Sequence, residues 1–249
     1  MAVNQAIQLP FEKYTDPGLY LFFDDGVCLT LTREFIDKTK QRYLQDPQLL
    51  PPEVREAQDY ELCSICPAKE TSEICHAIPT VFPFLEHVNR FLSYEPVTAL
   101  YRPEPSDSPK GDSVLHVART TVQRAVQYVS ILSLMHYCEV GRAYYKYFAG
   151  VIPFMDPLMI AERVYLNMYW DLHGDVPAIN SLIAQLRYEL DVTVRCQMKR
   201  LRLFCKSDPF LNAFANMHIA TMFLELSIET RMRERFNARN MSSVQPGTH

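Results

Sequence analysis

A cluster of three cysteines in one short segment places the strongest constraint on how this chain can fold. Cys63 and Cys66 form a Cys-x-x-Cys pair that is followed directly by Pro67, and Cys75 and His76 come shortly afterwards. A tight turn can point two thiols at this spacing toward one ion, and a third thiol from the same loop can join them. The segment therefore predicts a metal site that fixes the path of the surrounding chain.

This segment leaves the identity of the fourth ligand open. A structural zinc site needs four ligands in a closed tetrahedral shell. The candidates are His76, Cys138, Cys28 and a more distant histidine. The competing interpretation is that the three cysteines are ordinary buried thiols, because a free cysteine packs like a small hydrophobe. The Cys-x-x-Cys spacing favours the metal site.

The composition indicates a packed, largely helical protein. Of the 249 residues, 48% are hydrophobic and only 7 are glycine, which is enough apolar sequence for a sizeable core. The net charge of −4 creates no overall attraction to nucleic acid or anionic lipid. The longest apolar run, 125–138, is too short to cross a membrane. We therefore expect a protein that does not enter a membrane.

The N-terminus and the cysteine count together indicate a reducing compartment. Residues 1–14 contain neither the basic region nor the continuous apolar core of a signal peptide. Without a secretory signal, the odd number of 7 cysteines makes a disulfide framework an unexpected arrangement. We therefore expect a cytoplasmic protein from a bacterium or a similarly simple cell.

Residues 1–117 are predicted to form β-hairpins, the cysteine loop and one helix, with a further short amphipathic helix before the loop. The Asp-Gly pair at 25–26 is a strong hairpin signal, because glycine tolerates the positive φ of a tight turn. Apolar residues recur at helical spacing after Pro79. The predicted strands are 19–23, 27–31, 97–101 and 113–117, and the predicted helices are 33–46 and 80–92. The two hairpins are expected to pair into a small antiparallel sheet.

Residues 118–237 are predicted to form a helical bundle, followed by a flexible tail over 238–249. Two Asp-Pro pairs, at 156–157 and 208–209, are typical helix starts, because Asp caps free N–H groups and Pro suits the first turn. The predicted helices are 119–139 with a continuation toward 148, 157–171, 177–206 and 209–236. The predicted fold class is therefore α+β: a small antiparallel sheet and a cysteine metal knuckle, packed on this bundle as one integrated domain.

The arrangement of these signals resembles a bacterial family of uncharacterised function. The likeness covers about residues 19–205 and includes Cys63-x-x-Cys66-Pro67, Cys75, the helix and strand that follow, and a cysteine inside a later helix. The resemblance implies that Cys138 is the fourth ligand. This chain has His76 and Glu139 where the family tends to have proline. An imidazole is then not an obligatory ligand, so His76 becomes the second choice.

Helix geometry agrees with Cys138 over its neighbour His136. On a continuous helix the two side chains point about 200° apart, so they cannot both face one ion unless the helix breaks. His136 instead shares a face with Glu139. Di-iron bundles use a related pair twice, but this chain has no second copy. We expect His136 and Glu139 to face solvent or to be hydrogen-bonded.

Three features of the C-terminal half are explained most simply by packing and solvation. Residues 135–170 are rich in Tyr, Phe and Met, which can line a ligand pocket but also form the core of a bundle. Cys196 and Cys205 lie on opposite sides of their helix and are expected to be core or surface thiols. The late helices also carry several basic residues: Arg187, Arg195, Lys199, Arg200, Arg202, Lys206, Arg231, Arg233 and Arg235. We expect a solvated helix face rather than a nucleic-acid surface.

The sequence contains no familiar enzyme motif. A Gly-rich phosphate loop, Gly-x-Ser-x-Gly, His-Glu-x-x-His and the kinase motifs are all missing. We therefore expect a metal-stabilised interaction or regulatory module, with a protein partner or self-association, in which Cys63, Cys66, Cys75 and Cys138 hold a structural zinc. The first alternative is an iron–sulfur or redox-sensing protein that uses the same four thiols. The second is an enzyme that binds a small molecule in the aromatic bundle.

Overall fold

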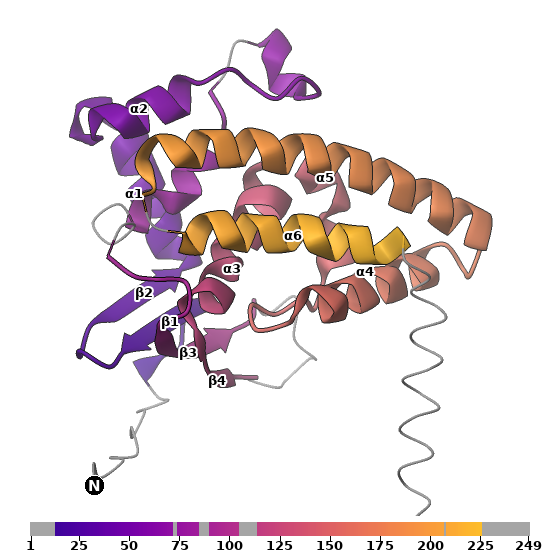
Figure 1. The fold of residues 1–249 in the computed structure, drawn as a ribbon, viewed down its shortest axis with the longest axis horizontal. Helices are drawn as coiled ribbons and strands as arrows, with labels where there is room; N and C mark the ends of the chain where they lie inside the picture. The colour runs from indigo at the N-terminus through magenta and orange to yellow at the C-terminus, as the bar shows by residue number, and fades with distance from the viewer. Residues whose placement is uncertain (1–12, 72–73, 85–89, 105–113, 207, 226–249) are drawn as a thin grey trace, which may run out of the picture.

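The structure is a computed structural model that describes residues 13–71, 74–84, 90–104, 114–206 and 208–225. A four-stranded antiparallel sheet packs against a set of helices (Figure 1). The predicted α+β fold class is confirmed. Among the described helices, none has the length and apolar character that a membrane span requires.

The sheet has the strand order β2-β1-β3-β4, so the two hairpins pair through β1 and β3. Its strands are β1 Gly18–Phe23, β2 Cys28–Thr32, β3 Pro96–Arg102 and β4 His116–Thr121. Gly26 in the first hairpin turn has φ 85°, as the Asp-Gly signal predicts. The first three strands match the predicted ones closely, whereas β4 begins three residues later than predicted. Leu19 opposes Tyr101 in the central pair of strands, β1 and β3.

Two long helices begin at aspartate caps, of which Asp156 was predicted from the sequence and Asp175 was not. The Asp156 carboxylate accepts from the Met159 amide at 2.8 Å, and the Asp175 carboxylate accepts from the Ala178 amide at 3.1 Å. The α-helices are α1 Arg33–Gln45, α2 Pro52–Asp59, α3 Val122–Leu132, α4 Pro157–Asp171, α5 Val176–Phe204 and α6 Pro209–Glu225. Short 3-10 helices cover Pro47–Leu49, Pro67–Glu70, Ile78–Phe84 and Gly141–Phe148.

Two predicted helices differ from the observed ones. The segment predicted as helix 80–92 is a 3-10 helix over Ile78–Phe84, and residues 85–89 lie outside the described part. The predicted helix 119–139 ends as α3 at Leu132 and continues as a π-helical turn over Ser133–Tyr137. Cys138 follows with extended backbone, φ −76° and ψ 127°. Cys138 therefore lies just after a helix and not inside one, so the angular comparison with His136 does not apply.

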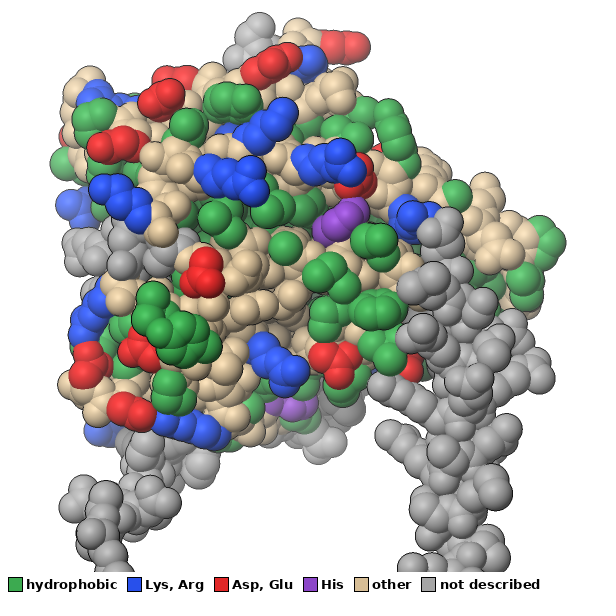
Figure 2. All heavy atoms as spheres, viewed as in Figure 1, with side chains coloured by type: hydrophobic (Ala, Val, Ile, Leu, Met, Phe, Trp, Pro, Cys, Tyr) green, Lys and Arg blue, Asp and Glu red, His purple; other side chains and the backbone are tan. Residues whose placement is uncertain are grey.

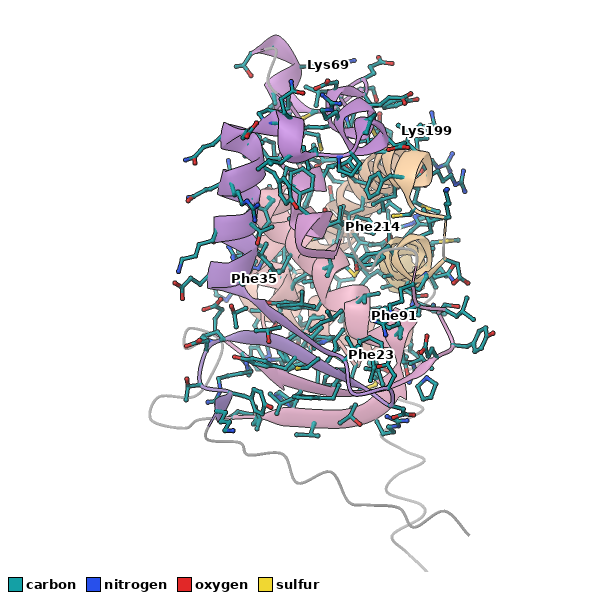
Figure 3. All side chains as sticks on the ribbon, turned by 90° about the vertical axis from the view of Figure 1, so that its left-hand side faces the viewer. Phe23, Phe35, Lys69, Phe91, Lys199 and Phe214 are labelled. Atoms are coloured by element: carbon teal, nitrogen blue, oxygen red, sulfur yellow. The ribbon has the colours of Figure 1, made fainter. Side chains whose placement is uncertain are left out.

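The helices stack on one face of the sheet around α6. Helix α6 packs against α3, α4 and α5, and α2 packs against α5. Figure 1 shows α5 and α6 side by side, and Figure 3 shows the sheet on one side of the helices. One core cluster contains Leu19 and Val97 of the sheet together with Leu134 and Phe214 of the helical half. The segment that carries the cysteines follows α2 and lies against α5. The end of the predicted last helix, 226–236, and the predicted tail 238–249 lie outside the described residues.

Candidate functional site

The four preferred ligands and His76 line one small cavity between the cysteine segment, the end of the π-helical turn and α5. Its lining includes Cys63, Cys66, Cys75, His76 and Cys138. Its volume of about 10 Å³ is close to the smallest that holds one water molecule. As the side chains are placed, residues 13–71, 74–84, 90–104, 114–206 and 208–225 contain no three His, Cys, Asp or Glu groups poised around one ion. The ligand assignment therefore stays a prediction, but the structure brings its members together across a long sequence separation.

A tight turn positions the first two thiols. The Cys66 amide donates to the Cys63 carbonyl at 2.9 Å, and the Lys69 amide donates to the Cys66 carbonyl at 3.1 Å. Pro67 begins the short helix that follows, because its missing N–H is not needed there. Burial raises the pKa of the Cys66 thiol, while an N–H bond from the Ala68 backbone to its sulfur opposes that rise. The turn thus aims an amide donor at this sulfur.

A second turn presents Cys138 in the same way. The Cys138 amide closes the π-helical turn by donating to the Ser133 carbonyl at 2.9 Å, and the chain then bends. The backbone N–H groups of Gly141 and Val140 donate to the Cys138 sulfur. Burial raises the pKa of this thiol to about 11, and these two donors oppose the rise. The two amide donors partly offset the cost of ionising this buried sulfur, and they would support a thiolate bound to a metal.

The bend after Cys138 depends on a glycine, and its loss should destabilise the protein. A Cβ at Gly141 would lie 1.9 Å from the Leu134 carbonyl oxygen, which is backbone and cannot rotate away. We expect Gly141→Ala to lower the free energy of unfolding by about 2–4 kcal/mol, because the turn must deform. Urea unfolding checks this. Gly26→Ala is the control: Gly26 has no heavy atom within 4 Å of the added Cβ, so only its positive φ should cost about 1 kcal/mol. Equal losses for the two variants would contradict the prediction.

The third sulfur also accepts a hydrogen bond. The Gln197 side chain on α5 donates its Nε2 hydrogen to the Cys75 sulfur at 3.2 Å. Three sulfurs around the cavity, those of Cys66, Cys75 and Cys138, therefore face N–H donors. A neutral thiol is a weak acceptor, whereas metal-bound thiolates are regularly held by such donors. These donors would help to hold metal-bound thiolates, whereas burial by itself favours the neutral thiols.

Arg200 is a fully buried cation beside these thiols. Its side chain is 0% exposed, and it lines the same cavity. One terminal nitrogen donates to the Tyr60 and Glu61 carbonyls at 3.0 and 2.8 Å, while Nε and the other terminal nitrogen have no partner. Within the described residues no carboxylate forms an ion pair with it. The expectation that Arg200 belongs to a solvated basic face is therefore wrong, because the cysteine segment covers its side of α5.

Helical spacing explains which α5 residues reach the site. Cys196, Gln197 and Arg200 stand at intervals of one, three and four residues, so they share the side of α5 that faces the cysteine segment. Gln197 is 0% exposed, like Arg200. In the sequence, the signal for this face is the presence of two polar residues, Gln197 and Arg200, three positions apart on an amphipathic helix. The pattern becomes informative only once the face is known to be covered.

Cys196 is the site residue that sequence reasoning placed elsewhere. Its sulfur accepts a hydrogen bond from the Cys63 thiol, which raises the pKa of Cys63 and lowers the pKa of Cys196. Both are free cysteines. Cys63 lines the enclosed cavity and also a larger open pocket of about 330 Å³ that contains Cys196. The Cys63 side chain therefore lies between the enclosed cavity and the open pocket.

Of the remaining candidates, Glu139 also lines this cavity, whereas His136 and Cys28 do not. His136 Nδ1 accepts a hydrogen bond from Arg33 at 3.0 Å, and Glu139 pairs with Arg142 at 2.7 Å. Both are thus hydrogen-bonded, but to different partners. Cys28, a candidate fourth ligand, is exposed on β2.

The aromatic segment packs as core in its central part. Tyr144, Tyr147 and Phe148 belong to the core cluster. Two of their hydroxyls bond to carboxylates, Tyr144 to Glu189 and Tyr147 to Asp171, each at 2.8 Å. The core-packing interpretation of this segment therefore fits better than a ligand pocket.

Comparisons with family models, curated proteins and solved structures find no match to this chain. The resemblance to a bacterial family therefore stays a prediction. The function is argued from the cavity and the residues around it.

Proposed function

We propose that this chain is a zinc-stabilised module in which Cys63, Cys66, Cys75 and Cys138 bind one Zn²⁺. What supports the proposal is that four thiols from both halves of the sequence line one small enclosed cavity. Zn²⁺ is held by thiolates at about 2.3 Å, so binding would draw the sulfurs inward. His76 lines the same cavity and is the second choice for the fourth ligand.

The buried Arg200 is the observation that carries the proposal. A guanidinium that is 0% exposed, with two nitrogens unpaired, is costly unless an anion accompanies it. Zn²⁺ with four thiolates is a doubly negative complex, and it would lie in the cavity that Arg200 lines. The metal would convert an uncompensated buried charge into a charge-assisted pair. The N–H donors at Cys66, Cys75 and Cys138 would stabilise the same negative charge.

The size of the cavity favours a single ion over an iron–sulfur cluster. About 10 Å³ accommodates one atom-sized guest, whereas a cluster adds several iron and sulfide atoms. Zinc binding would require the thiols to rearrange, because no three ligand groups of the described residues now surround one point and Cys63 interacts with Cys196. Rotation of the Cys63 side chain would turn its sulfur from the open pocket into the cavity that it already lines.

A four-thiolate site would be structural. The closed shell leaves no position for a water or a substrate, so the metal would act as a tether and not as a Lewis acid. It would join the segment after α2 to the turn after α3, beside α5. Such a tether fits an interaction or regulatory module, whose partner would be another protein or a second copy of the chain.

Anaerobic purification tests the proposal. We expect a colourless protein with one zinc per chain by elemental analysis, since the cavity holds one ion. After exchange with Co²⁺, the visible spectrum should report tetrahedral thiolate coordination.

Two outcomes would contradict zinc binding in different ways. A brown protein with iron and acid-labile sulfide would establish the iron–sulfur alternative. A protein that holds no stoichiometric metal after reconstitution under reducing conditions would contradict both the zinc site and the iron–sulfur alternative. The Cys28→Ser variant is the matched control, because Cys28 is exposed on β2 and away from the cavity.

A further inference from the structure

We propose that Cys63 and Cys196 form a redox switch, in which a hydroperoxide converts the two thiols into a disulfide and removes Cys63 from the metal. The disulfide is argued from the contact between the two thiols and their common pocket. The loss of metal rests on the proposed zinc site.

The contact between the two sulfurs is the first observation. Cys63 and Cys196 line the same pocket and their thiols interact directly, and the Cys196 thiol is also directed at the Glu61 carbonyl, at 3.7 Å. The two residues are far apart in sequence and belong to different elements, the turn after α2 and the helix α5. Sulfurs in hydrogen-bonding contact need only a small rotation to reach the bonding distance of about 2.0 Å.

Access to solvent is the second observation. The open pocket of about 330 Å³ contains both thiols and is lined by Ser64, Arg195 and Lys199 among others. Figure 2 shows basic side chains gathered over the α5 region on this face, and Figure 3 shows Lys199 on the outer side of that helix. A peroxide can enter such a pocket. It meets Cys196 first, because Cys196 is half-buried whereas Cys63 is buried.

The chemistry balances with a hydroperoxide as the oxidant. The Cys196 sulfur attacks one peroxide oxygen, the O–O bond breaks, and with H₂O₂ the products are a sulfenic acid and water. The Cys63 sulfur then attacks the sulfenic sulfur, the S–S bond forms, and the S–O bond breaks. In the metal-free chain the hydroxide that leaves takes the remaining thiol proton and becomes a second water. In the zinc-loaded chain Cys63 is already a thiolate, so the hydroxide takes its proton from solvent and the Cys63–zinc bond breaks. The two cysteines lose two electrons and the peroxide gains them.

The two states of Cys63 exclude one another. Zinc needs its sulfur in the enclosed cavity, whereas the disulfide holds it at the open pocket, and Cys63 lines both. Oxidation would leave three thiolates, and a three-ligand site holds zinc less tightly. Peroxide would therefore release the zinc and break the link that the metal forms between the two segments.

Peroxide treatment of the zinc-loaded chain tests the switch. We expect peptide mapping by mass spectrometry to find one linked pair, Cys63–Cys196, and a chromogenic chelator to register zinc release at the same rate. Cys196→Ser should slow zinc release at least about tenfold, because the reacting thiol is missing. Its stoichiometric zinc content before treatment checks that the variant folds. Cys28→Ser, which removes an exposed thiol without a thiol partner, should behave as the parent chain does.

The outcomes separate this inference from the zinc proposal. Unchanged zinc release in Cys196→Ser, or a disulfide that links other cysteines, would overturn the switch while zinc binding stands. If the chain binds no zinc, the same peptide mapping on the metal-free protein still decides whether Cys63 and Cys196 form the disulfide.

Discussion

A Cys138→Ser variant is expected to lose its zinc and to unfold about 3 kcal/mol more easily than the parent chain. The serine hydroxyl does not replace a thiolate, so the site would keep three ligands and lose the one that comes from the C-terminal half. Binding free energy of a structural metal is also folding free energy, so the loss appears in both measurements. Elemental analysis and urea unfolding at fixed zinc concentration check the two effects.

Cys205→Ser is the matched control for this experiment. Cys205 and Cys138 are 5% and 6% exposed, so each variant places a hydroxyl in a buried site. Burial alone raises the pKa of Cys205, whereas backbone N–H groups also bond to Cys138. We expect Cys205→Ser to lose about 1–2 kcal/mol and to keep its zinc, because it removes packing and no ligand. If Cys138→Ser keeps its zinc while Cys75→Ser loses it, His76 replaces Cys138 as the fourth ligand.

Local signals predicted the elements whose geometry is set by a few neighbouring residues. The Asp-Gly turn predicted the first hairpin, and Asp156 predicted the start of α4, because turn and cap preferences act within three or four residues. The placement of Cys138 beside the cysteine loop was implied by the resemblance to a bacterial family. The cavity that Cys138 shares with the cysteine segment agrees with that placement.

Features that depend on long-range packing were not predictable in this way. The π-helical turn before Cys138 ends a segment that looks helical throughout, because the chain must bend to present its sulfur. In sequence Arg200 looks like its exposed neighbours Lys199 and Arg202. It is buried only because the cysteine segment covers its side of α5. Cys196 meets Cys63 for the same reason. An apolar periodicity shows which face of α5 is buried, but it does not show what covers that face.

An Arg200→Met variant is expected to weaken zinc binding about 10- to 100-fold, as removal of a group that supports metal ligands does. Methionine keeps much of the buried volume but neither the charge nor the hydrogen bonds to Tyr60 and Glu61. The metal-free chain would lose those bonds but also an uncompensated buried cation, so part of the loss is offset. The zinc-loaded chain would lose the counter-charge as well. The zinc-loaded form should therefore lose about 1.5–3 kcal/mol more than the metal-free form, which corresponds to the expected change in affinity.

Comparison of the two forms separates a counter-charge from a merely structural arginine. Unfolding of the parent chain and of Arg200→Met, each with zinc and with chelator, completes a thermodynamic cycle. Lys199→Met is the control, because Lys199 is an exposed cation on the same helix and its loss should cost within about 0.5 kcal/mol in either form. If Arg200→Met loses the same free energy with and without zinc, Arg200 only anchors Tyr60 and Glu61, and the charge argument for the metal fails. If the difference appears and Arg200→Lys restores part of it, positive charge at this position is what the metal site requires.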